Sequence, residues 1–132
     1  MLKLPDFSKP FQMHCDASVV GLGAELLQEL CPVAFFSKKL TPTEARYHVM
    51  DREFMAIFKA CMKWRQYLHG NKCTIYTDHE PLKYIYMLPN LNARQARWLE
   101  CLAELDLSIV YKPGVENVAA DVLSCFGQHV EK

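Results

Sequence analysis

Apolar and polar residues alternate in five short segments of the chain, and this pattern predicts five β-strands. The segments cover residues 11–16, 19–28, 32–37, 73–77 and 107–111. The first three follow one another with only short links, so we expect them to form an antiparallel meander. Proline and glycine at positions 113 and 114 are typical of a turn and end the last strand.

Apolar residues that recur every three to four positions predict helices between these strands. The longest such stripe runs from Tyr47 to Leu68, and Gly70 ends it. Shorter patterns predict helices over residues 81–87, 93–105 and 118–125.

The start of the long helix is left open by the pattern. Thr41 to Glu44 has the spacing of a capping box, with proline at the first helical position. Either the helix begins there, or a turn precedes a helix that begins near Val49.

The predicted elements follow the order β-β-β-α-β-α-α-β-α. A meander followed by strands that helices connect predicts a mixed sheet covered by helices, an α/β fold. At 132 residues, the chain is expected to form one domain.

Composition excludes several classes of protein. A hydrophobic content of 51% predicts a folded core and excludes disorder. The sequence has no apolar run long enough for a transmembrane helix, and its first residues lack the layout of a signal peptide. The six cysteines include no CxxC pair, which argues against zinc. Fifteen basic and fifteen acidic residues cancel, which argues against binding nucleic acid through bulk charge.

Four carboxylates occupy positions where burial would be costly. Asp16 and Asp78 end predicted strands, and Glu53 lies close to the apolar stripe of the long helix. Asp121 interrupts an apolar helical turn. Each acid alone could equally be structural, as a turn cap, a helix-end residue or, for Glu53, a half-exposed partner of Arg46 or of neighbours on the Lys59 side. Four such acids in one mixed sheet favour a site for hard divalent cations, Mg²⁺ or Mn²⁺.

The motifs around these acids resemble the ribonuclease H domain of the reverse transcriptase of gypsy-type LTR retrotransposons, relatives of retroviruses. The resemblance extends from Pro5 to about Cys125 and keeps the order of the family. The matching stretches are PDFSKPF (5–11), CDAS (15–18), GLGA (21–24), PVAFFSKKL (32–40), DRE (51–53), WRQYLHG (64–70), YTDHEPLK (76–83), ARW (96–98) and YKPGVENVAADVLS (111–124).

The resemblance implies a ribonuclease H-like fold, with three antiparallel strands and then two parallel ones in a five-stranded mixed sheet flanked by helices. It also implies an endonuclease that hydrolyses the RNA strand of RNA–DNA hybrids and leaves 5′-phosphate and 3′-hydroxyl ends. Asp16, Glu53, Asp78 and Asp121 would be its catalytic residues and would hold two Mg²⁺ ions about 4 Å apart, which Mn²⁺ can replace. Asp16 would bridge the ions, with Asp121 on the water side and Glu53 and Asp78 on the leaving-group side.

Contacts to the RNA strand are expected from small residues near the first acid. Specificity in this class comes from duplex shape and the 2′-hydroxyl group. Ala17, Ser18 and Gly21 would let backbone groups approach the RNA sugars, although a tight turn explains Gly21 equally well. His79, beside Asp78, is either a proton shuttle or outer contact near the metals, or simply a turn residue.

Contacts to phosphates are expected from four basic residues, namely Lys38, Lys39, Arg94 and Arg97. Arg94 is the first candidate because it lies at the start of a predicted helix.

The partners implied are an RNA–DNA hybrid and a polymerase domain upstream in the same reverse transcriptase. Residues 1–132 would then be a single ribonuclease H domain, with a core of about 8–126, excised from a longer polyprotein. No membrane partner and no small-molecule cofactor are expected. The expected location is the cytoplasm, inside the virus-like particle of the retroelement, or the nucleus for a domesticated protein.

Two other functions remain open. One is an inactive ribonuclease H-like connection domain, and the other is a domesticated host protein that uses the fold for protein contacts. Connection domains tend to lose the carboxylates. The presence of all four acids therefore favours the enzyme.

Overall fold

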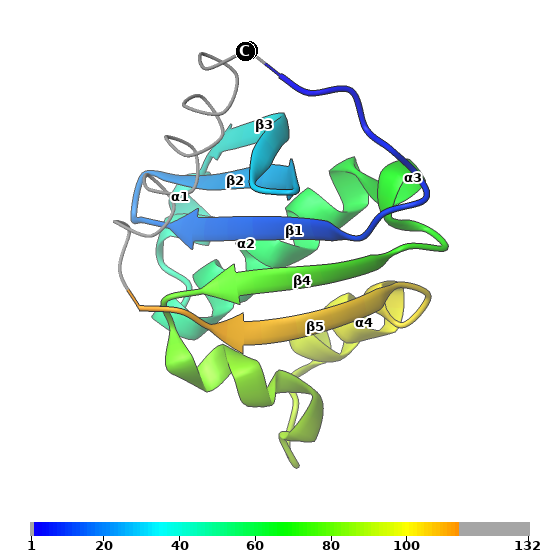
Figure 1. The fold of residues 1–132 in the computed structure, drawn as a ribbon. Helices are drawn as coiled ribbons and strands as arrows, with labels where there is room; N and C mark the ends of the chain where they lie inside the picture. The colour runs from blue at the N-terminus through cyan, green and yellow to red at the C-terminus, as the bar shows by residue number, and fades with distance from the viewer. Residues whose placement is uncertain (1, 114–132) are drawn as a thin grey trace.

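A computed structural model describes residues 2–113 (Figure 1). Within these residues the strands β1 to β5 form one sheet in the order β3-β2-β1-β4-β5. β1 pairs antiparallel with β2, and β2 with β3, whereas β4 is parallel to both β1 and β5. This confirms the predicted mixed sheet. The strands are β1 (Phe11–Ala17), β2 (Gly21–Gln28), β3 (Cys31–Lys39), β4 (Lys72–Thr77) and β5 (Asp106–Tyr111).

The helices that the structure describes connect β3 to β4 and β4 to β5. They are α1 (Pro42–Ala45), α2 (Val49–Lys63), α3 (Arg65–Leu68), the 3-10 helix η1 (Glu80–Met87) and α4 (Ala93–Leu102). In Figure 1, α2 and α4 lie behind the sheet. No helix among residues 2–113 is long and apolar enough to cross a membrane. The helix predicted over residues 118–125 lies outside the described residues.

The core is built between α2 and the central strands. Alternate β1 residues, Phe11, Met13 and Cys15, are buried, as a strand with one face in the core requires. α2 contributes Phe54, which meets the Trp98 ring of α4 edge to face with ring centroids 5.3 Å apart. This packing fixes α2 and α4 as a pair on one face of the sheet.

The structure settles where the first helix begins. Thr41 forms the predicted capping box, since its hydroxyl accepts a hydrogen bond from the Glu44 N–H (3.1 Å) and its own N–H donates to the Glu44 carboxylate (3.0 Å). The helix that it caps, α1, is only one turn long. α2 then starts separately at Val49.

The prediction of one continuous helix up to Leu68 is wrong at one point. The helix is interrupted at Trp64, between α2 and α3. At Trp64 the backbone leaves helical geometry (φ −107°, ψ 22°) while its side chain is buried edge-on against Phe36. Gly70 follows α3 with a φ of +83°, a left-handed conformation that suits glycine and ends the helical segment as predicted.

Candidate active site

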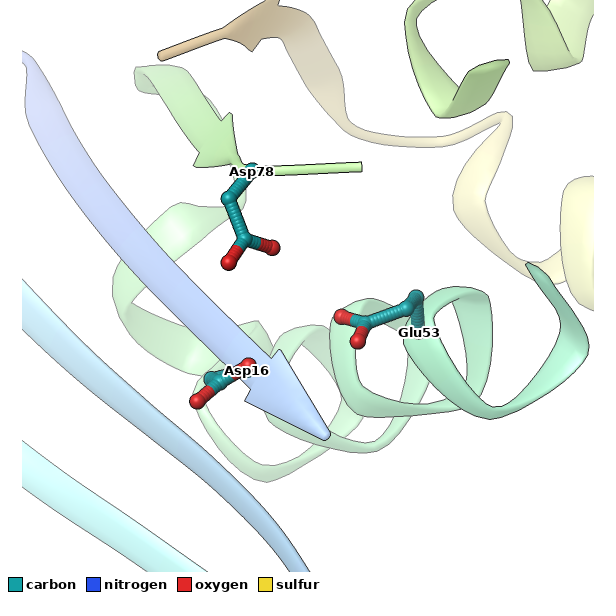
Figure 2. A group of neighbouring side chains, drawn as sticks. All are labelled: Asp16, Glu53 and Asp78. Carbon is teal, nitrogen blue, oxygen red and sulfur yellow. The ribbon is translucent and has the colours of Figure 1, made fainter. Parts of the chain in front are cut away.

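Three of the four predicted acids meet at one end of the sheet. The parallel register pairs His14 of β1 with Tyr76 of β4, so Asp16 and Asp78 lie at matching positions two residues further on. Glu53 projects from the second turn of α2 toward both (Figure 2). One carboxylate oxygen from each of the three residues lies within 4.8 Å of the others.

The three carboxylates differ in their surroundings. Asp16 and Asp78 are exposed, whereas Glu53 is only 8% exposed. The Oε2 atom of Glu53 is buried and has no hydrogen-bond partner among the described residues. Burial, and then the negative charges of Asp16 and Asp78, raise the pKa of Glu53 to about 7, against the opposing effects of the Ala17 N–H and Arg52.

These features fit a divalent cation. A buried carboxylate oxygen without a partner is costly, and a cation among three acids would satisfy it and remove their mutual repulsion. All the available ligand atoms are carboxylate oxygens, the set that Mg²⁺ and Mn²⁺ prefer. Asp121, the fourth predicted ligand, lies outside the described residues, and its place in the set stays a prediction.

Replacing Glu53 with glutamine is expected to stabilise the metal-free protein at pH 8. Because the pKa of Glu53 is higher in the folded protein than its ordinary value of 4.5, folding takes up a proton between about pH 4.5 and 7. The free energy of unfolding therefore falls as pH rises through this window. Glu53→Gln should add roughly 1–3 kcal/mol at pH 8 and little at pH 5, measured by urea unfolding in EDTA.

Glu100→Gln is the matched control for this measurement, because Glu100 is an exposed residue of α4. It should change stability by less than about 0.5 kcal/mol at either pH. A Glu53→Gln protein that is equally stabilised at pH 5 and pH 8 would show that ionisation of the buried Glu53 carboxyl is not the cause.

The small residues near Asp16 contribute to the local structure. The Ser18 hydroxyl accepts hydrogen bonds from the N–H groups of Val20 and Gly21, both at 3.2 Å, and so holds the turn between β1 and β2. A Cβ atom added to Gly21 would come 3.1 Å from the Lys38 carbonyl oxygen on β3. The close approach of β2 to β3 thus accounts for Gly21. Contacts of Ala17, Ser18 and Gly21 with RNA stay a prediction.

His79 takes part in the turn that follows Asp78. Its N–H donates to the Thr77 hydroxyl (3.1 Å), and its carbonyl oxygen accepts from the Leu82 N–H (3.1 Å) at the start of η1. Its backbone therefore supports the turn interpretation. A role of its half-buried imidazole near the metals stays a prediction.

The four basic residues predicted to contact phosphates differ in the contacts that their own side chains make. The Lys38 ammonium pairs with Glu44 at 3.1 Å. The Arg94 guanidinium lies 3.8 Å above the Tyr47 ring and 3.8 Å from the Asp51 carboxylate. Lys39 and Arg97 are exposed. Arg94, the first candidate from the sequence, is thus anchored between α4 and the start of α2, and phosphate binding by all four residues stays a prediction.

Two residues of this region were not singled out from the sequence. The Gln95 side chain of α4 donates a 2.7 Å hydrogen bond to Asp51, two residues before Glu53. The available signal is the capping-box spacing of Asn92 and Gln95, which marks the start of α4. This spacing gives no sign that Gln95 bonds to Asp51 of α2.

A cavity of about 480 Å³ adjoins the acids. Asp16 and Asp78 line it together with aromatic residues of β3 and β4, among them Phe35 and Tyr76. Glu53 does not line it, so the cavity lies beside the cluster of three acids and is not the cluster itself.

Comparison with protein families and curated proteins gives a consistent result. A family model described as the RNase H-like domain found in reverse transcriptase matches residues 6–105. The retrovirus-related Pol polyprotein from transposon gypsy of Drosophila melanogaster is 41% identical over 125 residues, and that from transposon 297 is 40% identical over 124. Each alignment covers 94% of this chain but only 12% of the relative.

Solved structures show the same fold. A foamy viral protease-reverse transcriptase in complex with dsDNA has a TM-score of 0.72 at 20% identity, over 86% of this chain and 25% of that one. LC11-RNase H1 in complex with RNA/DNA hybrid has a TM-score of 0.66 at 13% identity, over 81% of this chain and 88% of that one.

Proposed function

Because the chain belongs to the family of RNase H-like domains found in reverse transcriptases, we propose that it is an endonuclease that hydrolyses the RNA strand of RNA–DNA hybrids. The observation that carries this proposal is the cluster of three acids, in which a buried Glu53 oxygen without a hydrogen-bond partner among residues 2–113 accompanies two exposed aspartates. An all-carboxylate site is unsuited to gripping a phosphate directly, because like charges repel. It is suited to holding the cations that assist the attack of water on a phosphodiester.

The proposed ligands are Asp16, Glu53, Asp78 and Asp121, with two Mg²⁺ ions, or Mn²⁺ in their place, as the cofactor. Bound divalent ions supply Lewis-acid chemistry, in which the attacking water is more easily deprotonated and the charge that develops on phosphate is neutralised. Asp16 and Asp78 are exposed, so a phosphodiester can reach them from solvent. Glu53 is held from the core side by α2, which leaves its carboxylate little freedom to move away.

The proposed setting is a reverse transcriptase in which a polymerase domain lies upstream of residues 1–132. Relatives that match the chain are retroelement polyproteins, and among the similar folds are a foamy viral protease-reverse transcriptase and an RNase H1, each solved with RNA/DNA hybrid. The connection-domain alternative is disfavoured because three ligand positions are filled and brought together.

Cleavage is expected to require a divalent cation and to be limited by binding. With a net charge of zero, the isolated domain should bind hybrid weakly and with a shallow salt dependence, because the salt slope follows the number of phosphates neutralised. The measurement is the initial rate on hybrid with labelled RNA, in Mg²⁺, Mn²⁺ or EDTA, over a range of hybrid and salt concentrations. The rate should rise with hybrid concentration or with fusion to an upstream polymerase domain, and vanish in EDTA.

No cleavage at saturating hybrid with Mn²⁺, in both the isolated domain and the fusion, would contradict the proposal and favour the connection domain. Cleavage that persists in EDTA would also contradict it.

A further inference from the structure

The first turn of α4 is bonded to the turn of α2 that precedes Glu53. Asp51 is only 6% exposed. Its Oδ1 atom accepts a 2.7 Å hydrogen bond from Gln95 Nε2, and its Oδ2 atom lies 3.8 Å from the Arg94 guanidinium. A carboxylate this buried is stabilised only by such partners.

Gln95 is itself held in one orientation. The Gln95 Oε1 atom accepts a hydrogen bond from the backbone N–H of Asn92 (3.1 Å). The backbone N–H of Gln95 donates in turn to the Asn92 side chain (2.7 Å). With the amide oxygen used by this capping box, the amide nitrogen is directed to Asp51. One side chain thus caps α4 and ties it to α2.

Glu53 needs such support. It is buried on α2, and one of its carboxylate oxygens lies within 4.8 Å of oxygens of Asp16 and Asp78, so the position of this part of α2 sets the spacing of the three acids. The Phe54–Trp98 contact holds α2 against α4 just beyond Glu53, and the Asp51–Gln95 bond holds it just before. Glu53 therefore lies between two attachments to α4.

We propose that Asp51 and Gln95 are positioning residues for the metal ligand Glu53. This inference rests on the proposed function, since it assumes that Glu53 binds a cation. Neither residue reaches the cation. Together they fix the α2 turn so that Glu53 meets Asp16 and Asp78 before the cation arrives.

The test is a charge swap with rescue. Gln95→Glu keeps an acceptor for Asn92 but sets a carboxylate against Asp51. In the Asp51→Asn/Gln95→Glu double variant, an asparagine amide can donate to the new glutamate. Mn²⁺ affinity, measured by isothermal titration calorimetry, should fall roughly 10- to 100-fold in Gln95→Glu and recover to within a few-fold in the double variant. An added negative charge alone would strengthen cation binding, so a loss of Mn²⁺ affinity would indicate that Glu53 has been displaced.

Gln66→Glu is the matched control, because it adds the same charge at an exposed position of α3. Hydrogen exchange of the first turn of α2 gives a readout independent of activity, and should accelerate in Gln95→Glu alone. Equal Mn²⁺ affinity in Gln95→Glu and Gln66→Glu would overturn the inference. The proposed function would still stand in that case if the wild type cleaves hybrid. No Mn²⁺ binding by the wild type would overturn both. If Gln95→Glu does not fold, the double variant decides, and its failure to recover Mn²⁺ affinity overturns the inference.

Discussion

Replacing Asp16 with asparagine is expected to reduce cleavage of RNA–DNA hybrid by more than about 100-fold while the protein stays folded. Asparagine keeps the shape of the side chain, and its carbonyl oxygen can still accept the 2.9 Å hydrogen bond from the Ala17 N–H. The negative charge that the cation needs is lost. The same loss removes repulsion on Glu53, so the metal-free variant should be at least as stable as the wild type. Initial cleavage rates and thermal melts in EDTA measure the two effects.

Asp106→Asn provides the matched control. Asp106 is an exposed aspartate at the first residue of β5, at the opposite end of the parallel strands from the acids. Its activity should equal that of the wild type. Full activity in Asp16→Asn would contradict the assignment of the site.

The second large effect expected is selectivity among substrates. The RNA strand of the hybrid should be cut at least about 100 times faster than single-stranded RNA or duplex DNA of the same sequence. Recognition in this class depends on duplex shape and on the 2′-hydroxyl group, and each alternative substrate lacks one of the two. Separate labels on the RNA and DNA strands, resolved on denaturing gels, identify the strand that is cut and the 5′-phosphate on the product.

A contaminating nuclease is the main risk in that experiment, so the Asp16→Asn protein, purified in the same way, sets the background. Equal cutting of single-stranded RNA and hybrid, above this background, would assign the chain to a different class of nuclease.

Much of the fold and the meeting of three acids at the candidate site could be predicted because they depend on local patterns. Alternation of apolar residues in β1 places Phe11, Met13 and Cys15 in the core and leads to a strand end, where Asp16 stands. Asp78 likewise comes directly after the apolar alternation of β4. Because β1 and β4 are parallel, their carboxyl ends lie at the same edge of the sheet. The motifs then connected these acids to one family.

Other features depend on contacts that local sequence does not record. The turn between β2 and β3 was predicted, but its two central residues, Glu29 and Leu30, have φ values of 52° and 67° without the glycine or asparagine that usually signals such a turn. The helix break occurs at Trp64, whose ring is buried against Phe36, a contact with a distant part of the chain. Asp51 and Gln95 are 44 residues apart, and only the packing of α4 on α2 joins them.

Binding of a divalent cation by Asp16, Glu53 and Asp78 should be visible in a Mn²⁺ titration of the melting temperature at pH 8. Only the folded site binds the cation, so the wild type should gain about 2.7 kcal/mol, or roughly 5–15 °C, at a Mn²⁺ concentration near 100 times Kd. Glu53→Gln should melt higher than the wild type without metal and respond little to Mn²⁺. A wild-type melting temperature that stays flat up to millimolar Mn²⁺, or an equal rise in Glu53→Gln, would show that these three acids do not form a cation site.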